Sequence, residues 1–291
     1  MELQSPCKIN LLLNILGRRD DGFHALETVM LPVPLHDRII LKPAATGVSL
    51  TCTEPSLPVD AGNLVHRAAT TFFAASGAAG GVVIHLEKHV PLAAGLGGGS
   101  ANAAITLRGL NQLCGRPLAP EQLQALAAAL GSDVPFFLQD GPALGTSRGE
   151  VIEPLPPFPA LRGAHLLLVH PGFGIATAWA YRELAKFPEA LNGRPGRARE
   201  LIGRLSAGDL PAAGTALYNS LEAPALRKFP VLVLYQEFLR DCGAAATLMS
   251  GSGSTTFALF ADAATAEHAA MAFREQFGTV AWLRTVALAG T

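Results

Sequence analysis

Apolar residues occupy every second position near the start of the chain, in residues 7–16. The apolar set consists of Ile9, Leu11, Leu13 and Ile15. A period of two is typical of a β-strand that buries one face. We therefore predict a strand here, with the four apolar side chains on one face and Lys8 and Asn10 pointing together from the other.

The rest of the chain alternates strand and helix patterns and contains no internal repeat. A polar turn is expected over 18–24. Strands are predicted at 39–43, 48–53, 82–90, 165–170, 246–250, 255–260 and 280–288, and helices at 64–76, 100–115, 120–131 and 265–277, with further helices between 170 and 246. The helix over 120–131 has the clearest ends, because Pro120 opens it and Gly131 closes it.

Four of the seven residues 153–159 are proline. Proline extends the backbone and interrupts sheets, so this segment is the best candidate for a domain boundary. We expect an N-terminal domain over residues 1–155 and a C-terminal domain over 156–291. The element order after the boundary suits an antiparallel sheet backed by helices, which makes the expected fold class α+β.

Residues 91–104, PLAAGLGGGSANAA, contain four glycines among the five positions 95–99. The run lies between a predicted strand and a predicted helix, where free backbone N–H groups and the positive end of the helix dipole attract an anion such as phosphate. A Walker loop would need a lysine here, and the dinucleotide fingerprint would need glycine in place of Ser100. A hinge or a tight turn remains the alternative.

Composition limits the partners. The chain has 291 residues, of which 49% are hydrophobic and 15% are charged, and its formal net charge is −1. A nearly neutral protein has no overall attraction for nucleic acid or for an anionic membrane, so any anion site must be local. The four cysteines show no metal-ligand spacing, and we find no signal segment or membrane span. We expect a cytoplasmic, bacterial protein that binds neither nucleic acid nor membrane.

Five segments, in order along the chain, resemble the GHMP kinases. Residues 91–104 resemble the phosphate loop of that family, and their triple-glycine form is similar to the branch that acts on 4-diphosphocytidyl-2-C-methyl-D-erythritol. The other similar segments are residues 6–29, 131–138, 170–181 and 248–260. Two positions depart from the branch: Phe23 stands where tyrosine is usual, and Ala176 where proline is common.

The resemblance implies a two-domain α+β fold, with an N-terminal α/β domain of the ribosomal-S5 type and a C-terminal ferredoxin-like domain. It also implies phosphorylation of the 2-hydroxyl of diphosphocytidyl-methylerythritol by ATP with Mg²⁺, in the non-mevalonate pathway to isoprenoids, by a monomer or weak homodimer. The alternatives are a GHMP kinase for homoserine or mevalonate, and a non-catalytic nucleotide-binding protein.

The resemblance places ATP on the glycine run. The expected ATP-binding residues are Pro91, Ala94, Gly95, Leu96, Gly97, Gly98, Gly99, Ser100 and Asn102. The glycines and Ser100 would hold phosphates through backbone N–H groups, and the Ser100 hydroxyl could reach Mg²⁺.

Two residues are expected to be catalytic. Asp133 would accept the proton of the substrate hydroxyl, although aspartate before Pro135 could simply cap a helix over 135–139. Lys8 would neutralise developing charge and orient Asp133, unless it is an ordinary surface lysine.

The expected substrate-binding residues come from four segments. They are Asn10, Phe23, His24, Asp133, Thr177, Tyr181, Gly251, Ser252 and Gly253. Phe23 and Tyr181 would sandwich the cytosine, whose edge His24 would contact. Core packing, helix capping at Thr177 and a plain turn at 251–253 are the competing interpretations. His85 and His89 face one side of a strand too far apart to share a metal.

Overall fold

Two β-sheets organise the chain in the computed structural model, which describes residues 1–288. The strands are β1 (Glu2–Arg18), β2 (His24–Ala44), β3 (Gly47–Cys52), β4 (Gly81–Glu87), β5 (Ala143–Thr146), β6 (Val151–Pro154), β7 (His165–His170), β8 (Tyr218–Asn219), β9 (Ala246–Met249), β10 (Thr256–Phe260) and β11 (Trp282–Ala287). The larger sheet has the order β3-β4-β2-β1-β8, with β5 pairing β2 and β6 pairing β5. The smaller sheet is antiparallel, in the order β11-β7-β10-β9.

Helices pack on both sheets. They are α1 (Leu64–Ser76), α2 (Gly98–Leu113), α3 (Pro120–Leu130), α4 (Thr177–Leu184), α5 (Pro188–Leu191), α6 (Arg197–Ser206), α7 (Leu210–Gly214), α8 (Glu222–Lys228), α9 (Val231–Asp241) and α10 (Ala263–Phe277), with 3₁₀ turns η1 (Pro135–Leu138) and η2 (Pro159–Leu161). Segregated helices beside largely antiparallel sheets confirm the α+β class.

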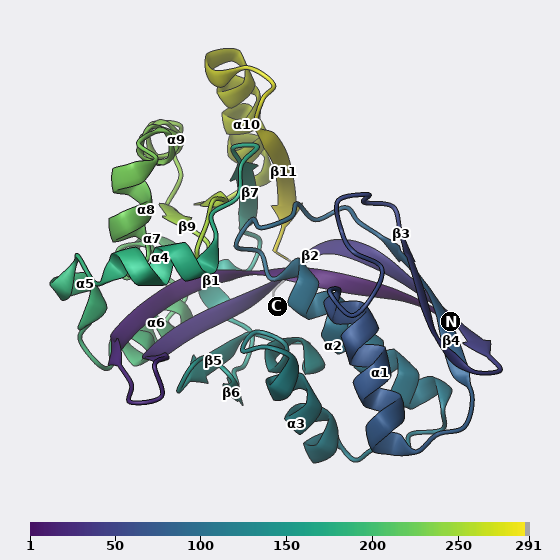
Figure 1. The fold of residues 1–291 in the computed structure, drawn as a ribbon. Coiled ribbons are helices and arrows are strands. Elements are labelled where there is room, and N and C mark those ends of the chain that lie inside the picture. Colours follow the sequence, from purple (N-terminus) through teal and green to yellow (C-terminus); the bar gives the residue numbers. More distant parts are fainter. Residues whose placement is uncertain (289–291) are drawn as a thin grey trace.

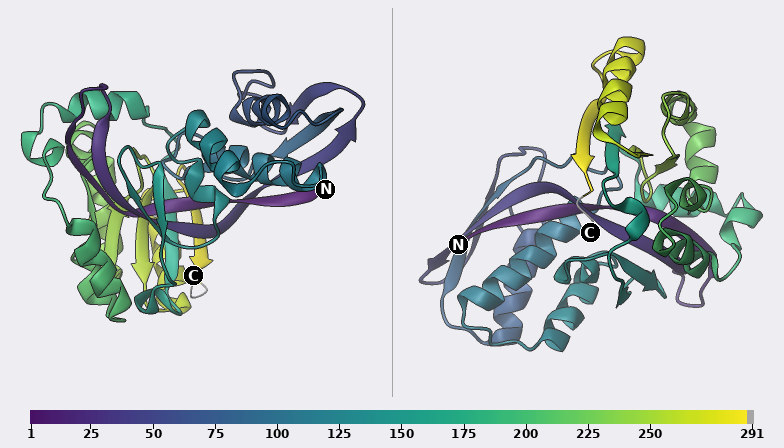
Figure 2. Two further views of the ribbon diagram at one scale, coloured as in Figure 1. Left: turned by 90° about the horizontal axis from the view of Figure 1, so that it is seen from below. Right: turned by 180° about the vertical axis from the view of Figure 1, so that it is seen from behind.

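The ribbon of β1 and β2 runs across the whole molecule (Figure 1). Helix α2 packs on one half of this ribbon, and α1 and α3 pack against α2 on the same side. The smaller sheet, with α9 and α10, stands against the ribbon from the other side. The two further views show the same division (Figure 2). Residues 2–44 therefore contact both parts of the molecule, namely the part with α1, α2 and α3 and the part with the smaller sheet.

The first strand differs from its predicted pattern. The pairing of β1 with β2 shifts register between Asn10 and Leu12, which marks a β-bulge or similar irregularity. Ile9 and Leu11 pack in one core cluster, whereas Leu13 and Ile15 pack in another. The expectation of one continuous apolar face was wrong, because a shift of register changes which side chains share a face.

Several element boundaries also differ. The prediction covered only residues 39–43 of β2 and missed its first part, where Pro32 pairs with Lys8 in the ladder and Pro34 falls at a shift of register. Helix α2 begins at Gly98, before the predicted start, and the segment after Asp133 forms a short 3₁₀ turn. Helices α1 and α3 agree closely with prediction, and Asn63 caps α1 through the N–H of Val65 at 2.9 Å.

The division at residue 155 stays a prediction. Strand β6 ends at Pro154 and β7 begins at His165, yet β8, which comes later, pairs with β1 of the larger sheet. Across residues 1–288, no helix has both the length and the apolar character needed to cross a membrane.

Candidate active site

A cavity of about 1380 Å³ lies between the two parts of the molecule. Its walls come from the β1–β2 hairpin, the glycine run before α2, the loop before η1, the start of α4 and residues 251–252. Ligand pockets are commonly about 300–1,000 Å³, so this cavity has room for two substrates. Every predicted site residue lines it except Gly253.

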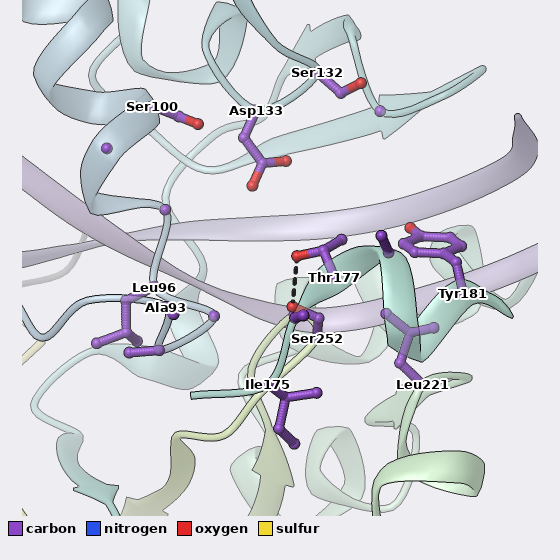
Figure 3. Close-up of a pocket in the computed structure, with 18 of the residues that line it drawn as sticks. Ala93, Leu96, Ser100, Ser132, Asp133, Ile175, Thr177, Tyr181, Leu221 and Ser252 are labelled. Carbon is purple, nitrogen blue, oxygen red and sulfur yellow. Dashed lines mark hydrogen bonds between the residues drawn. The ribbon is translucent and has the colours of Figure 1, made fainter. Parts of the chain in front are cut away.

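The predicted catalytic pair meets inside the cavity. Lys8 Nζ lies 3.4 Å from Asp133 Oδ2, and the exposed fractions of the two side chains are 3% and 40%. Asp133 points into the cavity toward Thr177 and Ser252 on the facing wall (Figure 3). The interpretation of Lys8 as a surface lysine was wrong, because its ammonium is buried beside a carboxylate.

Asp133 does not cap the following turn. The N-cap position of η1 is Val134, and no side-chain capping bond forms there. Among residues 1–288, the ion pair with Lys8 is the polar contact recorded for the Asp133 carboxylate. Its remaining lone pairs are therefore open toward the cavity, as a proton acceptor requires.

Asn10 holds the lysine in place. Its Oδ1 accepts a hydrogen bond from Lys8 Nζ, and its Nδ2 donates to Thr28 Oγ1 at 2.8 Å. The Thr28 hydroxyl in turn donates to the carbonyl of Leu12 at 2.6 Å. Both ends of the Asn10 amide are thus occupied by the protein, so its predicted contact with substrate stays a prediction.

The glycines of the run serve different purposes. At Gly95, where φ is +76°, a Cβ would lie 2.0 Å from the carbonyl oxygen of Ser250. At Gly97, where φ is +68°, a Cβ would lie 3.0 Å from Lys8 Cε. Gly95 therefore allows the contact with the second half of the chain, and Gly97 leaves room for the Lys8 side chain.

Ser250 is a site residue that the sequence analysis missed. Its hydroxyl donates to the carbonyl of Gly95 at 2.9 Å and accepts from the backbone N–H of Asn10 at 3.3 Å. The N–H of Lys8 also donates to the carbonyl of Leu96 at 2.9 Å. One buried hydroxyl thus joins β1, the glycine run and the loop after β9, three segments far apart in the sequence.

Residues 251–253 face different ways. Ser252 shares a 2.9 Å hydrogen bond with Thr177 at the cavity wall (Figure 3). Thr177 therefore has a partner on the same wall of the cavity, and no capping bond forms at the N-terminus of α4. A Cβ on Gly253 would lie 2.5 Å from Met249 Sδ, so this glycine packs behind the cavity wall, and its predicted contact with substrate stays a prediction.

The aromatic end of the cavity is built differently from the predicted sandwich. Tyr181 packs on His24, with ring centroids 5.1 Å apart and the planes tilted by 39°. Phe23 is 52% exposed, and the guanidinium of Arg148 lies 4.7 Å from its ring centroid. The hairpin therefore offers an exposed Phe23 ring next to the half-buried His24–Tyr181 pair.

The local environment sets the protonation of this pair. Burial, and then the charge of Arg18, lower the pKa of His24 below its usual value of 6.5, so its imidazole is neutral at physiological pH. Burial, and then the charge of Asp133, raise the pKa of the Tyr181 phenol, which stays protonated. A neutral imidazole has one donor and one acceptor nitrogen, which suits the edge of a base.

Positive charge gathers in the cavity although the chain as a whole is nearly neutral. The charged side chains that line it are Lys8, Arg18, Lys88, Arg148, Arg182 and one acid, Asp133. Lys88, Arg148 and Arg182 also pair with Asp37, Glu150 and Glu183, which lie outside the lining. The cavity surface itself still carries more positive than negative charge, which attracts an anionic ligand. The expectation of a purely local anion site is consistent with this arrangement.

The far end of the cavity, beyond the glycine run, was also missed. It is lined by Leu57, Pro58, Gly62, Asn63, Leu64 and Leu86. The sequence analysis predicted only the start of a helix in this region, and no motif marks the other residues. A single sequence gives no signal that this loop folds over the glycine run.

Magnesium is compatible with these donors, but the protein supplies few ligands. Residues 1–288 contain no group of three or more His, Cys, Asp or Glu side chains arranged to hold a metal. Mg²⁺ in such sites usually keeps its waters and binds one or two protein oxygens plus substrate phosphates. The hydroxyl of Ser100 and the carboxylate of Asp133 are two of the oxygens at the cavity wall, near the glycine run (Figure 3).

Comparisons with known proteins identify the family of the chain. The family model for the GHMP kinases N terminal domain matches residues 63–141, and that for the GHMP kinases C terminal domain matches residues 190–279. A 4-diphosphocytidyl-2-C-methyl-D-erythritol kinase from a Synechococcus strain is 42% identical over 285 residues, which cover 96% of this chain and 91% of the relative.

Two solved structures define the fold. A crystal structure of 4-(cytidine 5'-diphospho)-2C-methyl-D-erythritol kinase has a TM-score of 0.82 at 36% identity, covering 99% of this chain and 100% of that one. A homoserine kinase from Cytophaga hutchinsonii has a TM-score of 0.78 at 22% identity over 99% and 94%, which shows the fold alone. The chain therefore belongs to the GHMP kinase family and, within it, to the 4-diphosphocytidyl-2-C-methyl-D-erythritol kinases.

Proposed function

We propose that the protein transfers the γ-phosphoryl group of ATP to the 2-hydroxyl of 4-diphosphocytidyl-2-C-methyl-D-erythritol. The observation that carries the proposal is the Lys8–Asp133 pair, 3.4 Å apart, between the glycine run and the aromatic end of one cavity. A phosphate loop on one side and a base-sized aromatic surface on the other match a reaction between two nucleotides.

The two substrates occupy opposite ends of the cavity. Backbone N–H groups at the start of α2 receive the ATP phosphates, and the loop around Asn63 covers the nucleoside. The cytosine of the acceptor lies between Phe23 and the His24–Tyr181 pair, and its diphosphate is held by the cations near the hairpin. The methylerythritol then reaches the Thr177–Ser252 pair opposite Asp133.

Asp133 and Lys8 carry the chemistry. The Asp133 carboxylate takes the proton of the acceptor hydroxyl while that oxygen forms its bond to the γ-phosphorus and the bond from phosphorus to ADP breaks. Lys8 keeps Asp133 in position and stabilises the negative charge that builds on the transferred group. Asp133 is 40% exposed, so it can pass the proton to solvent after transfer.

Mg²⁺, bound with ATP and held by Ser100 or Asp133, would neutralise phosphate charge. Binding, orientation and proton transfer are supplied by the residues above.

An acceptor panel tests the proposal. Purified protein with Mg-ATP is expected to phosphorylate the diphosphocytidyl alcohol at least about a hundredfold more efficiently, by kcat/KM, than mevalonate or homoserine. Product formation followed by ³¹P NMR would identify the phosphorylated hydroxyl. Comparable turnover of mevalonate or homoserine would refute the assignment.

A substitution at Tyr181 tests the proposed base site. Loss of a stacking surface costs roughly 1–3 kcal/mol per base, so Tyr181→Ala should raise the KM for the diphosphocytidyl alcohol about tenfold or more and leave the KM for ATP unchanged. Phe23→Tyr is the matched control and should be nearly neutral, because it keeps the ring. Equal weakening of both substrates by Tyr181→Ala would mean that Tyr181 is a packing residue.

A further inference from the structure

A buried carboxylate outside the cavity touches both segments that flank the glycine run. The side chain of Asp37, on β2, is 0% exposed. Its Oδ1 accepts hydrogen bonds from the backbone N–H groups of His89 at 2.7 Å and Val90 at 2.9 Å. Its Oδ2 accepts from Lys88 Nζ and, at 3.0 Å, from Asn102 Nδ2.

These partners lie on opposite sides of the run. His89 and Val90 connect the end of β4 to Pro91, whereas Asn102 lies in the second turn of α2. A single side chain therefore fixes the distance between the entry and the exit of the glycine run. Asp37 itself is not part of the cavity wall, so it acts through its partners.

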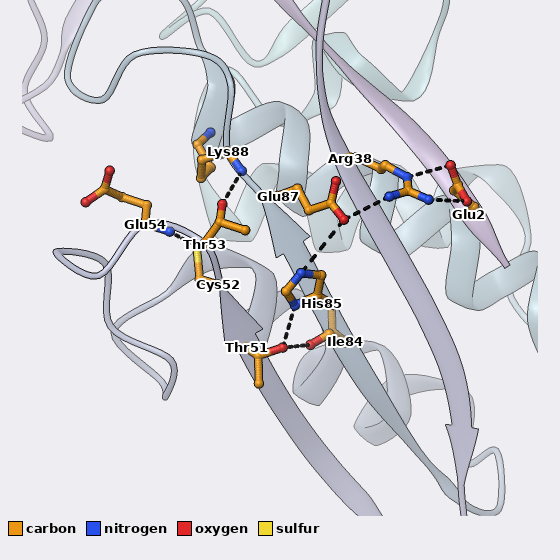
Figure 4. A network of polar contacts seen from close by, with 10 residues as sticks. All are labelled: Glu2, Arg38, Thr51, Cys52, Thr53, Glu54, Ile84, His85, Glu87 and Lys88. Carbon is orange, nitrogen blue, oxygen red and sulfur yellow. Dashed lines mark hydrogen bonds and ion pairs between the residues drawn. The ribbon is translucent and has the colours of Figure 1, made fainter.

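The network is closed and nearly dry. Asn102 Oδ1 accepts from Lys88 Nζ at 3.1 Å, and Asn102 Nδ2 also donates to Ser5 Oγ at 2.9 Å. The Lys88 side chain is 6% exposed, and its backbone N–H donates to Thr53 Oγ1 at 2.9 Å (Figure 4). A buried carboxylate with a full set of donors is rigid, and removing one partner is costly.

The lysine places charge at the start of α2. A Cβ on Gly98 would lie 3.4 Å from Lys88 Nζ, so the ammonium stands beside the first residue of that helix and lines the cavity. Asp37 determines where this ammonium lies. The Asp37 carboxylate thus orients both the backbone at His89 and Val90 and the ammonium of Lys88, beside the glycine run.

We propose that Asp37 is a positioning residue for the ATP phosphate loop, holding the loop in its binding geometry through Val90, Lys88 and Asn102. The nature of the ligand rests on the proposed function. The competing interpretation is that Asp37 only stabilises the fold, which would affect both substrates and the melting temperature without singling out ATP.

The first test replaces the carboxylate by its isosteric amide. In Asp37→Asn the new NH₂ group would face the donors of Lys88 and Asn102, while the carbonyl could still serve His89 and Val90. We expect the dissociation constant of the non-hydrolysable analogue AMP-PNP with Mg²⁺, measured by calorimetry without acceptor, to rise at least tenfold. The KM for the acceptor should change less than about twofold.

A double substitution separates positioning from plain stability. In Asp37→Asn/Asn102→Asp the carboxylate and the amide exchange places, and Lys88 keeps a carboxylate partner because its Nζ is already 3.1 Å from Asn102 Oδ1. The double variant should recover AMP-PNP affinity to within about threefold of the wild type. Failure to recover, in a variant that melts normally, would overturn the proposal.

Two further variants complete the test: one breaks the network at another residue, and the other is a control outside it. Asn102→Ala keeps the Asp37–Lys88 pair but removes the link to α2, so it should also weaken AMP-PNP binding severalfold. Unchanged affinity would overturn the proposal.

Glu2→Gln is the control. It alters the Arg38 network on the outer face of the same sheet and should leave the AMP-PNP affinity and the KM for the acceptor unchanged (Figure 4). The AMP-PNP readout needs no acceptor, so a failure of the acceptor panel would refute the proposed reaction and leave this test intact.

Discussion

At the residue scale, the site depends on one buried cation. Lys8 is 2% exposed, and a buried ammonium is costly unless it is paired and hydrogen-bonded. Its partners are Asn10 and Asp133, and Asn10 is itself fixed by Thr28. These contacts hold the Lys8 ammonium beside Asp133, the carboxylate that we propose as the proton acceptor.

Asp133→Asn should separate catalysis from binding. The amide keeps the shape of the side chain but cannot accept the proton, and general-base catalysis contributes roughly 10²–10⁴ in rate. We expect kcat to fall by that factor, while the affinity for AMP-PNP changes less than about threefold, as measured by steady-state kinetics and calorimetry.

Asp140→Asn is the matched control for Asp133. Asp140 pairs with Arg108 on the surface, with an exposed side-chain fraction of 88%. Exposed ion pairs contribute little, so kcat and the melting temperature should both stay unchanged. A near-normal kcat in Asp133→Asn would assign the proton to solvent or to another group.

At the scale of elements, the glycine run, which we propose binds ATP, is also a packing contact between the two halves of the chain. Gly95 contacts the carbonyl of Ser250 from the second half of the chain, whereas a Cβ at Gly99 would meet only Leu64 Cδ1, at 3.8 Å. Packing therefore requires glycine at position 95, whereas a larger residue would fit at position 99.

Gly95→Ala and Gly99→Ala should differ in stability. The first would force a methyl group onto a backbone oxygen at a φ of +76°, and overpacking and strain together should cost at least about 2 kcal/mol. The second lies in α2, where alanine gains roughly 0.5–1 kcal/mol over glycine. Thermal melting should show a clear drop for the first variant and no drop for the second. Equal losses would contradict the packing assignment.

The sequence predicted best those helices whose first or last residues are typical of helix ends. Helix α1 has its Asn63 cap, and α3 has Pro120 at its start, so each could be placed without knowing the rest of the fold. The first part of β2 could not, because its prolines argue against a ladder that its partners β1 and β5 nevertheless form. The two-residue strand β8 exists only through its pairing with β1.

The candidate site follows the same rule. Lys8, Ser100 and Asp133 stand in motifs and were predicted, whereas Ser250, Asp37 and Asn63 act through partners that are distant in the sequence or through a loop with no motif. Asp37, for example, meets Asn102 across 65 positions. Such contacts depend on the packing of whole elements, and a single sequence does not show that packing.

At the scale of the whole molecule, the two parts share a core. One hydrophobic cluster takes residues from both sheets, among them Cys7, Ile9, Leu31, Leu166, Leu168 and Phe257. Strand β8 adds to β1, and Asn219 within it donates to the carbonyls of Met249 at 2.7 Å and Gly251 at 2.8 Å. The loop between β9 and β10, which lines the cavity, is therefore held by a strand of the larger sheet.

This shared core predicts cooperative unfolding of the entire chain. If the halves on either side of residue 155 were independent, each would unfold at its own temperature and calorimetry would record two transitions. Because the cluster and β8 join them, we expect one transition, with a ratio of calorimetric to van't Hoff enthalpy of about 1. AMP-PNP with Mg²⁺ should shift that whole transition upward, since it binds only the folded state. A second peak that nucleotide leaves in place would instead identify a half that folds without the other, and the site would then form by docking of two folded units.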